Sequence, residues 1–148
     1  MKPPALACFI TSHGFGHATR TLAVLDALRR LLPEVRLHLF SRLPPSFLAD
    51  NLPPDSFELN EADTDVGLVQ NSPFRHDLSA TLARLDAFLP ITPDTLAPLT
   101  RRLEENGCAA ALCDVSPLGI AAAKEASLPS ILLENFTWDW IYEDYLRE

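Results

Sequence analysis

Two residues of the sequence have the types and the surroundings needed for proton transfer. His17 follows a glycine-bearing turn after the apolar run 5–10, and Asp114 directly follows the apolar run 109–113. A neutral imidazole can take a proton from a substrate hydroxyl, and a carboxylate that accepts the other ring N–H would orient it. If the two turns adjoin, the sequence predicts a His–Asp dyad with His17 as general base.

Each of these residues also has a purely structural interpretation. His17 could cap the helix that follows it or pack against a neighbour, and Asp114 could cap the helix that begins near Pro117. Residue types alone leave both interpretations open, because histidine and aspartate occur in both settings. The distance between the two side chains is therefore the first test of the dyad.

The turn before His17 carries four candidate ligand contacts: Ser12, His13, Gly14 and Gly16. Glycine can adopt positive φ and lets a ligand or another backbone approach closely, which we expect at Gly14 and Gly16. The first amides of the following helix lack intrahelical acceptors, so they can bind an anion or polarise a hydroxyl. Their partial positive charge also favours a neutral imidazole at His17.

Three further candidate substrate contacts lie late in the chain. Ser116, next to Pro117, is expected to begin a helix close to Asp114. Glu134 and Asn135 follow the apolar run 130–133 and could present polar groups to a sugar. A last predicted helix then carries apolar and aromatic residues on one face: Trp138, Ile141, Tyr142 and Tyr145. We expect this face to be uncovered and to contact a partner domain, because exposed apolar patches usually mark interaction sites.

Several other chemistries are excluded by spacing. His13 and His17 are four residues apart, but no H-E-x-x-H carboxylate accompanies them, and the three cysteines show no metal-ligand spacing, so no metal site is predicted. Thr19 stands where a dinucleotide fingerprint needs its third glycine, and no acidic residue follows the second predicted strand. No G-K-[ST] phosphate loop is present. Neither NAD nor P-loop ATP chemistry is expected.

Composition predicts one globular domain over residues 1–148. The chain is 47% hydrophobic and 22% charged, and it contains no apolar run near the ~20 residues that span a bilayer. Its formal net charge of −8 argues against nucleic acid as a partner. The number of cysteines, three, is odd, and we interpret them as reduced core residues. We therefore expect a soluble, cytoplasmic protein.

Strands and helices are expected to alternate. Apolar runs predict strands at 5–10, 35–39, 57–59, 109–113 and 130–133, with the first central, the last buried and His38 of the second at the surface. Helical spacing predicts a helix from 18 to Pro33, one begun by Ser72 that carries His76 in its first turn, and others begun by Thr92, Ser116 and Thr137. Residues 60–73 are expected to form a long ordered loop. The pattern predicts an α/β fold with a doubly wound parallel sheet, whose strand carboxyl ends hold the site.

Four segments of the chain together resemble a known family: S-H-G-F-G-H-A-T-R (12–20), D-V-G-L-V-Q (65–70), D-V-S-P-L-G (114–119) and N-F-T-W-D-W (135–140). They resemble the N-terminal Rossmann-like domain of GT-B glycosyltransferases. The likeness is closest to bacterial glycosyltransferase-like proteins related to the N-terminal domain of plant L-arabinokinase. That subgroup usually has glycine where His13 stands.

The resemblance implies a function for the dyad. In similar plant UDP-sugar transferases the histidine after the first strand deprotonates the acceptor hydroxyl, and an aspartate after a later strand orients it, so His17 and Asp114 would take these roles. The nucleotide-sugar donor, such as a UDP-sugar, would be a co-substrate held mainly by a C-terminal donor-binding domain, which we expect to lie outside residues 1–148. No other cofactor is implied.

Two functions follow as hypotheses. The first is the acceptor-side half of a glycosyltransferase that moves a sugar onto a sugar or other hydroxyl acceptor, with inversion by direct attack; it would need the missing donor-binding domain or a partner chain and would be inactive alone. The second is a noncatalytic carbohydrate or nucleotide-sugar binding module that regulates a partner through the Trp138–Tyr145 face.

Overall fold

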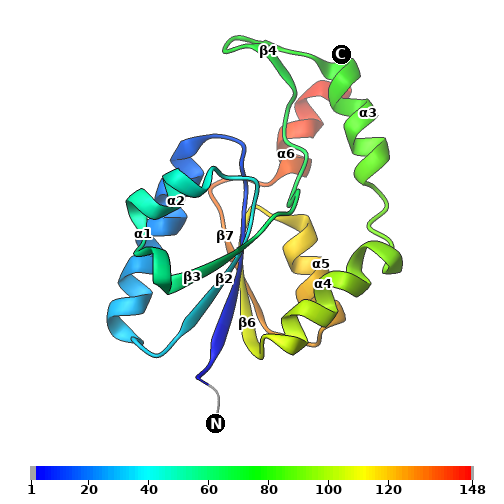
Figure 1. Cartoon of the computed structure of the whole chain (residues 1–148). Helices are drawn as coiled ribbons and strands as arrows, with labels where there is room; N and C mark the ends of the chain where they lie inside the picture. The colour runs from blue at the N-terminus through cyan, green and yellow to red at the C-terminus, as the bar shows by residue number, and fades with distance from the viewer. Residues whose placement is uncertain (1–2, 148) are drawn as a thin grey trace.

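The computed structural model describes residues 3–147, and its centre is a five-stranded parallel sheet (Figure 1). The strand order is β3-β2-β1-β6-β7, so β1 (Ala5–Ile10) is central, as predicted. The other strands are β2 (Arg36–Phe40), β3 (Phe57–Asn60), β6 (Cys108–Asp114) and β7 (Ser130–Leu133). All four pairings are parallel, which requires a crossover after each strand.

Helices cover both faces of the sheet, which confirms the predicted doubly wound architecture (Figure 1). Alternation along β1 divides the core: Cys8 and Ile10 pack with α1 (Phe15–Leu31) and α2 (Pro45–Asn51), whereas Ala7 and Phe9 pack with the helices opposite. Those helices are α4 (Pro93–Glu105) and α5 (Pro117–Glu125). A 3-10 turn, η1 (Pro54–Ser56), precedes β3.

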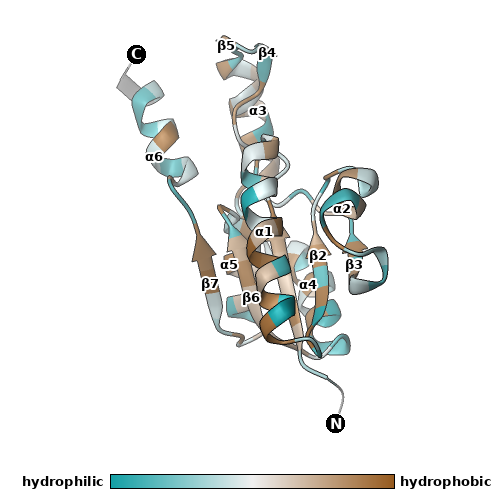
Figure 2. Cartoon of the chain, turned by 90° about the vertical axis from the view of Figure 1, so that its left-hand side faces the viewer, coloured by the Kyte–Doolittle hydropathy of each residue, from teal (hydrophilic) through white to brown (hydrophobic). Residues whose placement is uncertain are grey.

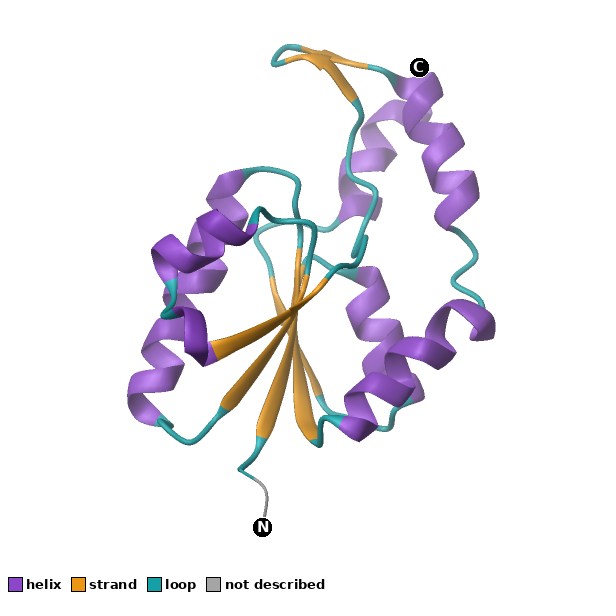
Figure 3. Cartoon of the chain, viewed as in Figure 1, coloured by secondary structure: helices purple, strands orange, loops and turns teal. Residues whose placement is uncertain are grey.

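The predicted helix start at Ser72 is wrong. Residues 70–76 instead form a hairpin of β4 (Gln70–Ser72) and β5 (Arg75–His76), which projects beyond the main sheet (Figure 3). The next helix, α3 (Leu78–Phe88), begins after Asp77, whose side chain accepts a hydrogen bond from the amide of Ala80. A carboxylate at this position caps a helix as well as a serine does, so α3 begins five residues later than expected.

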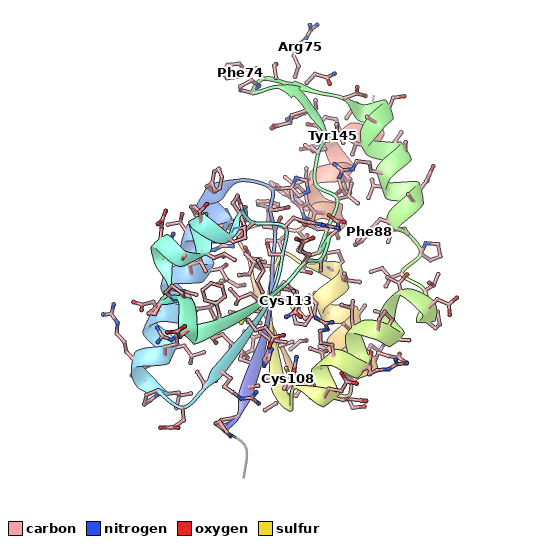
Figure 4. The ribbon with its side chains drawn as sticks, viewed as in Figure 1. Phe74, Arg75, Phe88, Cys108, Cys113 and Tyr145 are labelled. Atoms are coloured by element: carbon pink, nitrogen blue, oxygen red, sulfur yellow. The ribbon has the colours of Figure 1, made fainter. Side chains whose placement is uncertain are left out.

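Side chains at the hairpin turn point away from the molecule. Phe74, which falls within the helix predicted to begin at Ser72, is 94% exposed, and Phe74 and Arg75 stand at the tip in Figure 4. His76 is exposed, as expected, but belongs to β5 rather than to a helix. Two of the other predicted helix starts are confirmed, because Thr92 and Ser116 each accept a capping hydrogen bond, from Thr95 and Gly119.

Two expectations about burial are wrong. β7 was expected to be buried, but it forms an edge of the sheet and leaves Ile131 58% and Leu132 41% exposed (Figure 2). His38 was expected at the surface, but it is only 3% exposed. The reason is topology: β2 is paired on both sides and covered on both faces, whereas β7 is paired on one side.

His38 should make the fold sensitive to acid. Burial lowers the pKa of His38, although the Glu58 carboxylate, 3.5 Å from Nδ1, opposes the shift. As pH falls through the ordinary histidine pKa of about 6.5, the unfolded chain binds the proton more readily than the folded chain, so the free energy of unfolding decreases. Urea titrations on either side of that pH should show that His38→Leu loses less stability on acidification than the wild type.

The matched control for this experiment is His76→Leu, which makes the same change at an exposed imidazole. Both ring nitrogens of His38 lack hydrogen bonds within the described part of the chain, so leucine leaves no partner unsatisfied at neutral pH. An acid-induced loss that is equal in the wild type and in His38→Leu would contradict the prediction.

Candidate functional site

The two predicted corners meet at the carboxyl edge of the sheet. β1 and β6 are neighbours, and Asp114, the last residue of β6, pairs with Ile10, the last residue of β1. His17 lies in the first turn of α1, which begins five residues after β1 ends. Its Nδ1 lies 3.4 Å from Oδ1 of Asp114. The structure therefore brings His17 and Asp114 together, as the dyad hypothesis requires.

A third residue, Arg20, contacts both members of this pair. Its Nη2 donates to Oδ1 of Asp114 at 2.7 Å and lies 3.2 Å from Nδ1 of His17, while Nη1 donates to the Asn135 side chain at 3.2 Å. The sequence analysis missed Arg20, although its spacing of three residues from His17 on one helix was a usable signal. His17, Asp114, Arg20 and Asn135 form what we call the His17 cluster.

Burial differs sharply within the His17 cluster. The Asp114 side chain is fully buried, and its Oδ2 has no hydrogen-bond partner among the residues described. The His17 side chain is 15% exposed, so the ring is accessible from solvent, and the Phe136 ring packs nearly perpendicular to it at a centroid distance of 5.1 Å. A buried carboxylate next to a partly accessible imidazole is an arrangement suited to proton transfer.

The turn before α1 only partly matches its predicted role. Gly14 has φ +96° and its amide bonds to the carbonyl of Ser12, so glycine is required there. Gly16 lies within α1 without positive φ, and a Cβ added to it would meet nothing, so the backbone does not require glycine at this position. Gly14 is the N-terminal cap, which excludes that role for His17.

His13 belongs to a second cluster at the same edge. Its ring lies against Trp138 at a centroid distance of 5.7 Å and against Gly67, where a Cβ would approach the ring to 2.6 Å. Asp65 is 6% exposed and accepts from the Thr11 hydroxyl and from Nε1 of Trp138, both at 2.6 Å. Burial raises the pKa of Asp65, and these hydrogen bonds and His13 oppose the shift. Asp65 thereby ties the loop 61–69 to β1 and to the last helix.

The aromatic face is half-buried, whereas it was expected to be uncovered. The last helix, α6 (Trp138–Glu143), is followed by the turn η2 (Asp144–Arg147). Tyr142 stacks near Trp138 and donates to the carbonyl of Gly67, and the Tyr145 hydroxyl lies 2.8 Å from Nδ1 of His76. Burial raises the pKa of Tyr142 to about 12. The 65–76 segment therefore covers this face.

The remaining predicted contacts have different surroundings. Ser116 is fully buried, accepts from the amide of Gly119 and donates to the carbonyl of Thr64, so both of its roles are structural. Because Ser116 caps α5, the alternative of Asp114 as that cap is excluded. Glu134, Asn135 and Ser12 are exposed at the edge of the sheet. Of these three, Asn135 belongs to the His17 cluster, because its side-chain oxygen accepts a hydrogen bond from Arg20.

An apolar cavity of about 330 Å³ lies on the side of the sheet that α5 covers, opposite the side that α1 covers. Side chains of α3, α5, β7 and α6 line it, including Phe88, Ile120 and Leu132. Asp114 faces α1, whereas the cavity lies on the side of α5, so the cavity is separate from the His17 cluster. Trp138 lies between the two, since it lines the cavity and also contacts Phe136.

Within residues 3–147 no group of three or more His, Cys, Asp or Glu side chains could hold a metal ion. The cysteines Cys8, Cys108 and Cys113 are free and buried, and burial raises the pKa of Cys113 to about 12. Figure 4 labels Cys113 near the middle of the molecule and Cys108 below it. No helix in the described part of the chain is long and apolar enough to cross a membrane.

Comparison with solved structures defines the class of fold. CalG4, the calicheamicin glycosyltransferase, matches with a TM-score of 0.61 and 17% identity over 98% of this chain and 38% of its own. Phytolacca americana UGT2, solved with UDP-2fluoro-glucose and pterostilbene, matches with a TM-score of 0.57 and 19% identity over 89% of this chain and 30% of its own. The chain therefore has the Rossmann-like α/β fold found in GT-B glycosyltransferases.

Sequence comparison adds one curated relative. L-arabinokinase of Arabidopsis thaliana is 27% identical over 147 residues, which are 98% of this chain and 14% of that protein. The chain thus spans about a seventh of this relative and about a third of the structures described above. No protein-family model matches the sequence.

Proposed function

We propose that this chain is the acceptor-side part of a glycosyltransferase, in which His17 is the general base and Asp114 orients it. The observation that carries the proposal is the 3.4 Å approach of Nδ1 of His17 to Oδ1 of Asp114 at the carboxyl edge of the sheet. Ligands of open α/β sheets bind at this edge. The glycosyltransferase fold supports the same reaction class.

The proposed step transfers one proton and one sugar. The step requires the neutral tautomer whose proton is on Nδ1 and faces Asp114, so that Nε2 is free to accept the proton of an acceptor hydroxyl. The acceptor oxygen forms a bond to the anomeric carbon as the bond from that carbon to the phosphate oxygen breaks. The electron pair leaves with the nucleoside diphosphate, and direct attack inverts the anomeric centre. His17 ends as imidazolium next to the buried Asp114 carboxylate.

A second component would supply the donor. Solved structures of similar fold hold UDP or UDP-2fluoro-glucose, so a UDP-sugar is the proposed co-substrate, bound by a C-terminal domain or partner chain. The open edge at β7, with Ile131 and Leu132 exposed, gives such a component an apolar surface to cover. Asn135, Glu134 and Ser12 are polar groups that an acceptor could contact. Three free, buried cysteines fit a reducing, cytoplasmic setting.

One observation favours a noncatalytic sugar-binding module as the second candidate. Oδ1 of Asp114 is closer to Arg20, at 2.7 Å, than to His17, at 3.4 Å. A carboxylate that is held by arginine and does not receive the ring N–H would leave His17 without its orienting partner. The module would bind carbohydrate or nucleotide sugar at the same edge and perform no transfer.

The test is an assay of sugar transfer with and without a donor-binding half. We expect the 148-residue chain alone to show no turnover with UDP-sugars and hydroxyl acceptors, and we expect transfer when a donor-binding domain is joined to it or added. Product is quantified as glycosylated acceptor and as released UDP. Sugar binding by calorimetry without transfer in the joined protein would favour the module, and rapid transfer by the chain alone would contradict the proposal.

A further inference from the structure

Neither proton transfer by His17 nor the folding of α1 requires an arginine at position 20. Arg20 is the residue of the His17 cluster that contacts all three of the others, because it bonds to Asp114 and Asn135 and lies 3.2 Å from Nδ1 of His17. Its side chain is 30% exposed, although Nε is buried without a hydrogen-bond partner within residues 3–147. An arginine held in this way loses solvation and rotamer freedom, so its charge needs an explanation.

The charges around His17 supply that explanation. From β6 the buried carboxylate of Asp114 faces the ring, from its own helix α1 the Arg20 guanidinium faces it, and from the segment after β7 come the neutral Asn135 and the Phe136 ring. If Asp114 were the single charged partner, the pair would favour imidazolium, because an opposite charge within 4–6 Å stabilises the charged form. A protonated imidazole cannot take a proton from a hydroxyl.

We infer that Arg20 is a positioning residue that shares the charge of Asp114, so that this carboxylate orients His17 without holding it protonated. The 2.7 Å contact from Nη2 of Arg20 makes Asp114 part of a nearly neutral pair, and the proximity of Nη2 to Nδ1 of His17 adds repulsion against a second proton on the ring. The side-chain oxygen of Asn135 accepts a hydrogen bond from Nη1 and thereby sets the direction of the guanidinium. The catalytic meaning of this inference rests on the proposed function, but the charge coupling itself does not.

The coupling can be measured in the 148-residue chain without any sugar. Histidine labelled with ¹⁵N gives four imidazoles, and His17→Gln identifies the signals of His17. We expect Arg20→Met to raise the proton affinity of His17 about tenfold, a shift typical of removing one nearby charge. Arg20→Lys should keep most of the wild-type behaviour, because it keeps the charge but not the planar fork.

Two further variants keep the test decisive. Arg20→Gln removes the charge but keeps a donor for Asp114, and it replaces Arg20→Met if that variant fails to fold, as judged by its ¹H–¹⁵N spectrum. Adding Asp114→Asn to either neutral variant should abolish the increase, because no charge remains beside the ring. An unchanged His17 titration in the folded neutral variants would overturn the inference.

A transfer assay then separates this inference from the proposed function. In the joined enzyme, Arg20→Met should lower the transfer rate at neutral pH by up to about tenfold and regain most of it as pH is raised by about one unit, whereas a purely structural defect would lower the rate at every pH. If the joined wild type shows no transfer, the proposed function fails, yet the NMR titration still decides the charge coupling.

Discussion

Replacing His17 by alanine is expected to lower sugar transfer by about 10²–10⁴-fold in the joined enzyme, which is the usual contribution of a positioned general base. The loss should appear in kcat, because the proton moves only as the acceptor oxygen attacks the sugar. Affinity for the nucleotide sugar should change little, since its donor-binding half is elsewhere in the proposal. The transfer rates of the wild type and of His17→Ala are measured at saturating donor, as released UDP and as glycosylated acceptor.

The matched control is His76→Ala, the same change at an exposed imidazole in the β4–β5 hairpin. We expect this variant to transfer at the wild-type rate. The transfer rate of Asp114→Asn should lie between those of His17→Ala and His76→Ala. This substitution keeps the shape of the buried side chain but removes the charge that stabilises imidazolium. Transfer by His17→Ala at the wild-type rate would remove the dyad from the mechanism and leave only a glycosyltransferase-like scaffold.

The meeting of His17 and Asp114 could be predicted because parallel sheets constrain it. Continuous apolar runs identify β1 and β6 as strands covered on both faces, and the residues after such strands all emerge at one edge. The arrangement then needs only that the two strands be neighbours. The prediction was conditional on that neighbour relation, and the pairing of β1 with β6 fulfils it.

Arg20 and Asp65 could not be predicted in the same way. Each contact depends on one side-chain conformation across a long sequence separation: 94 residues separate Arg20 from Asp114, and 73 separate Asp65 from Trp138. An aspartate in a polar loop is normally solvated, and its burial is stable here because Thr11, Thr64 and Trp138 donate hydrogen bonds to it. Periodicity contains no information about such partners.

The β4–β5 hairpin was missed for a local reason. Ser72-Pro73 has the composition of a helix start, but the same dipeptide also suits a tight turn, and the strands on either side are too short to show alternation. Contacts from elsewhere support the hairpin: the amide of Asp77 donates to the carbonyl of Val69, and His76 contacts Tyr145. Tertiary contacts therefore outweighed the local pattern.

Replacing Gly119 by alanine should destabilise the fold by about 1–3 kcal/mol, the typical cost of overpacking a core. Gly119 is where α5 meets the sheet, and a Cβ there would lie 2.6 Å from Cγ of Phe9 and 2.9 Å from Sγ of Cys113. Phe9 cannot move aside easily, because it is fully buried and stacks on Phe40 at a centroid distance of 4.5 Å. This strain exceeds the gain of up to about 1 kcal/mol that alanine brings to a helix.

Gly16→Ala is the matched change, because Gly16 also lies in a helix but a Cβ there would meet nothing. Urea unfolding should show Gly16→Ala to be as stable as the wild type or more stable by up to about 1 kcal/mol, opposite in sign to Gly119→Ala. Equal stability of Gly119→Ala and the wild type would contradict the packing argument. Because Gly16→Ala should leave the fold intact, a loss of transfer in that variant would come from a ligand that approaches the backbone beside His17, the role that the sequence predicts for this glycine.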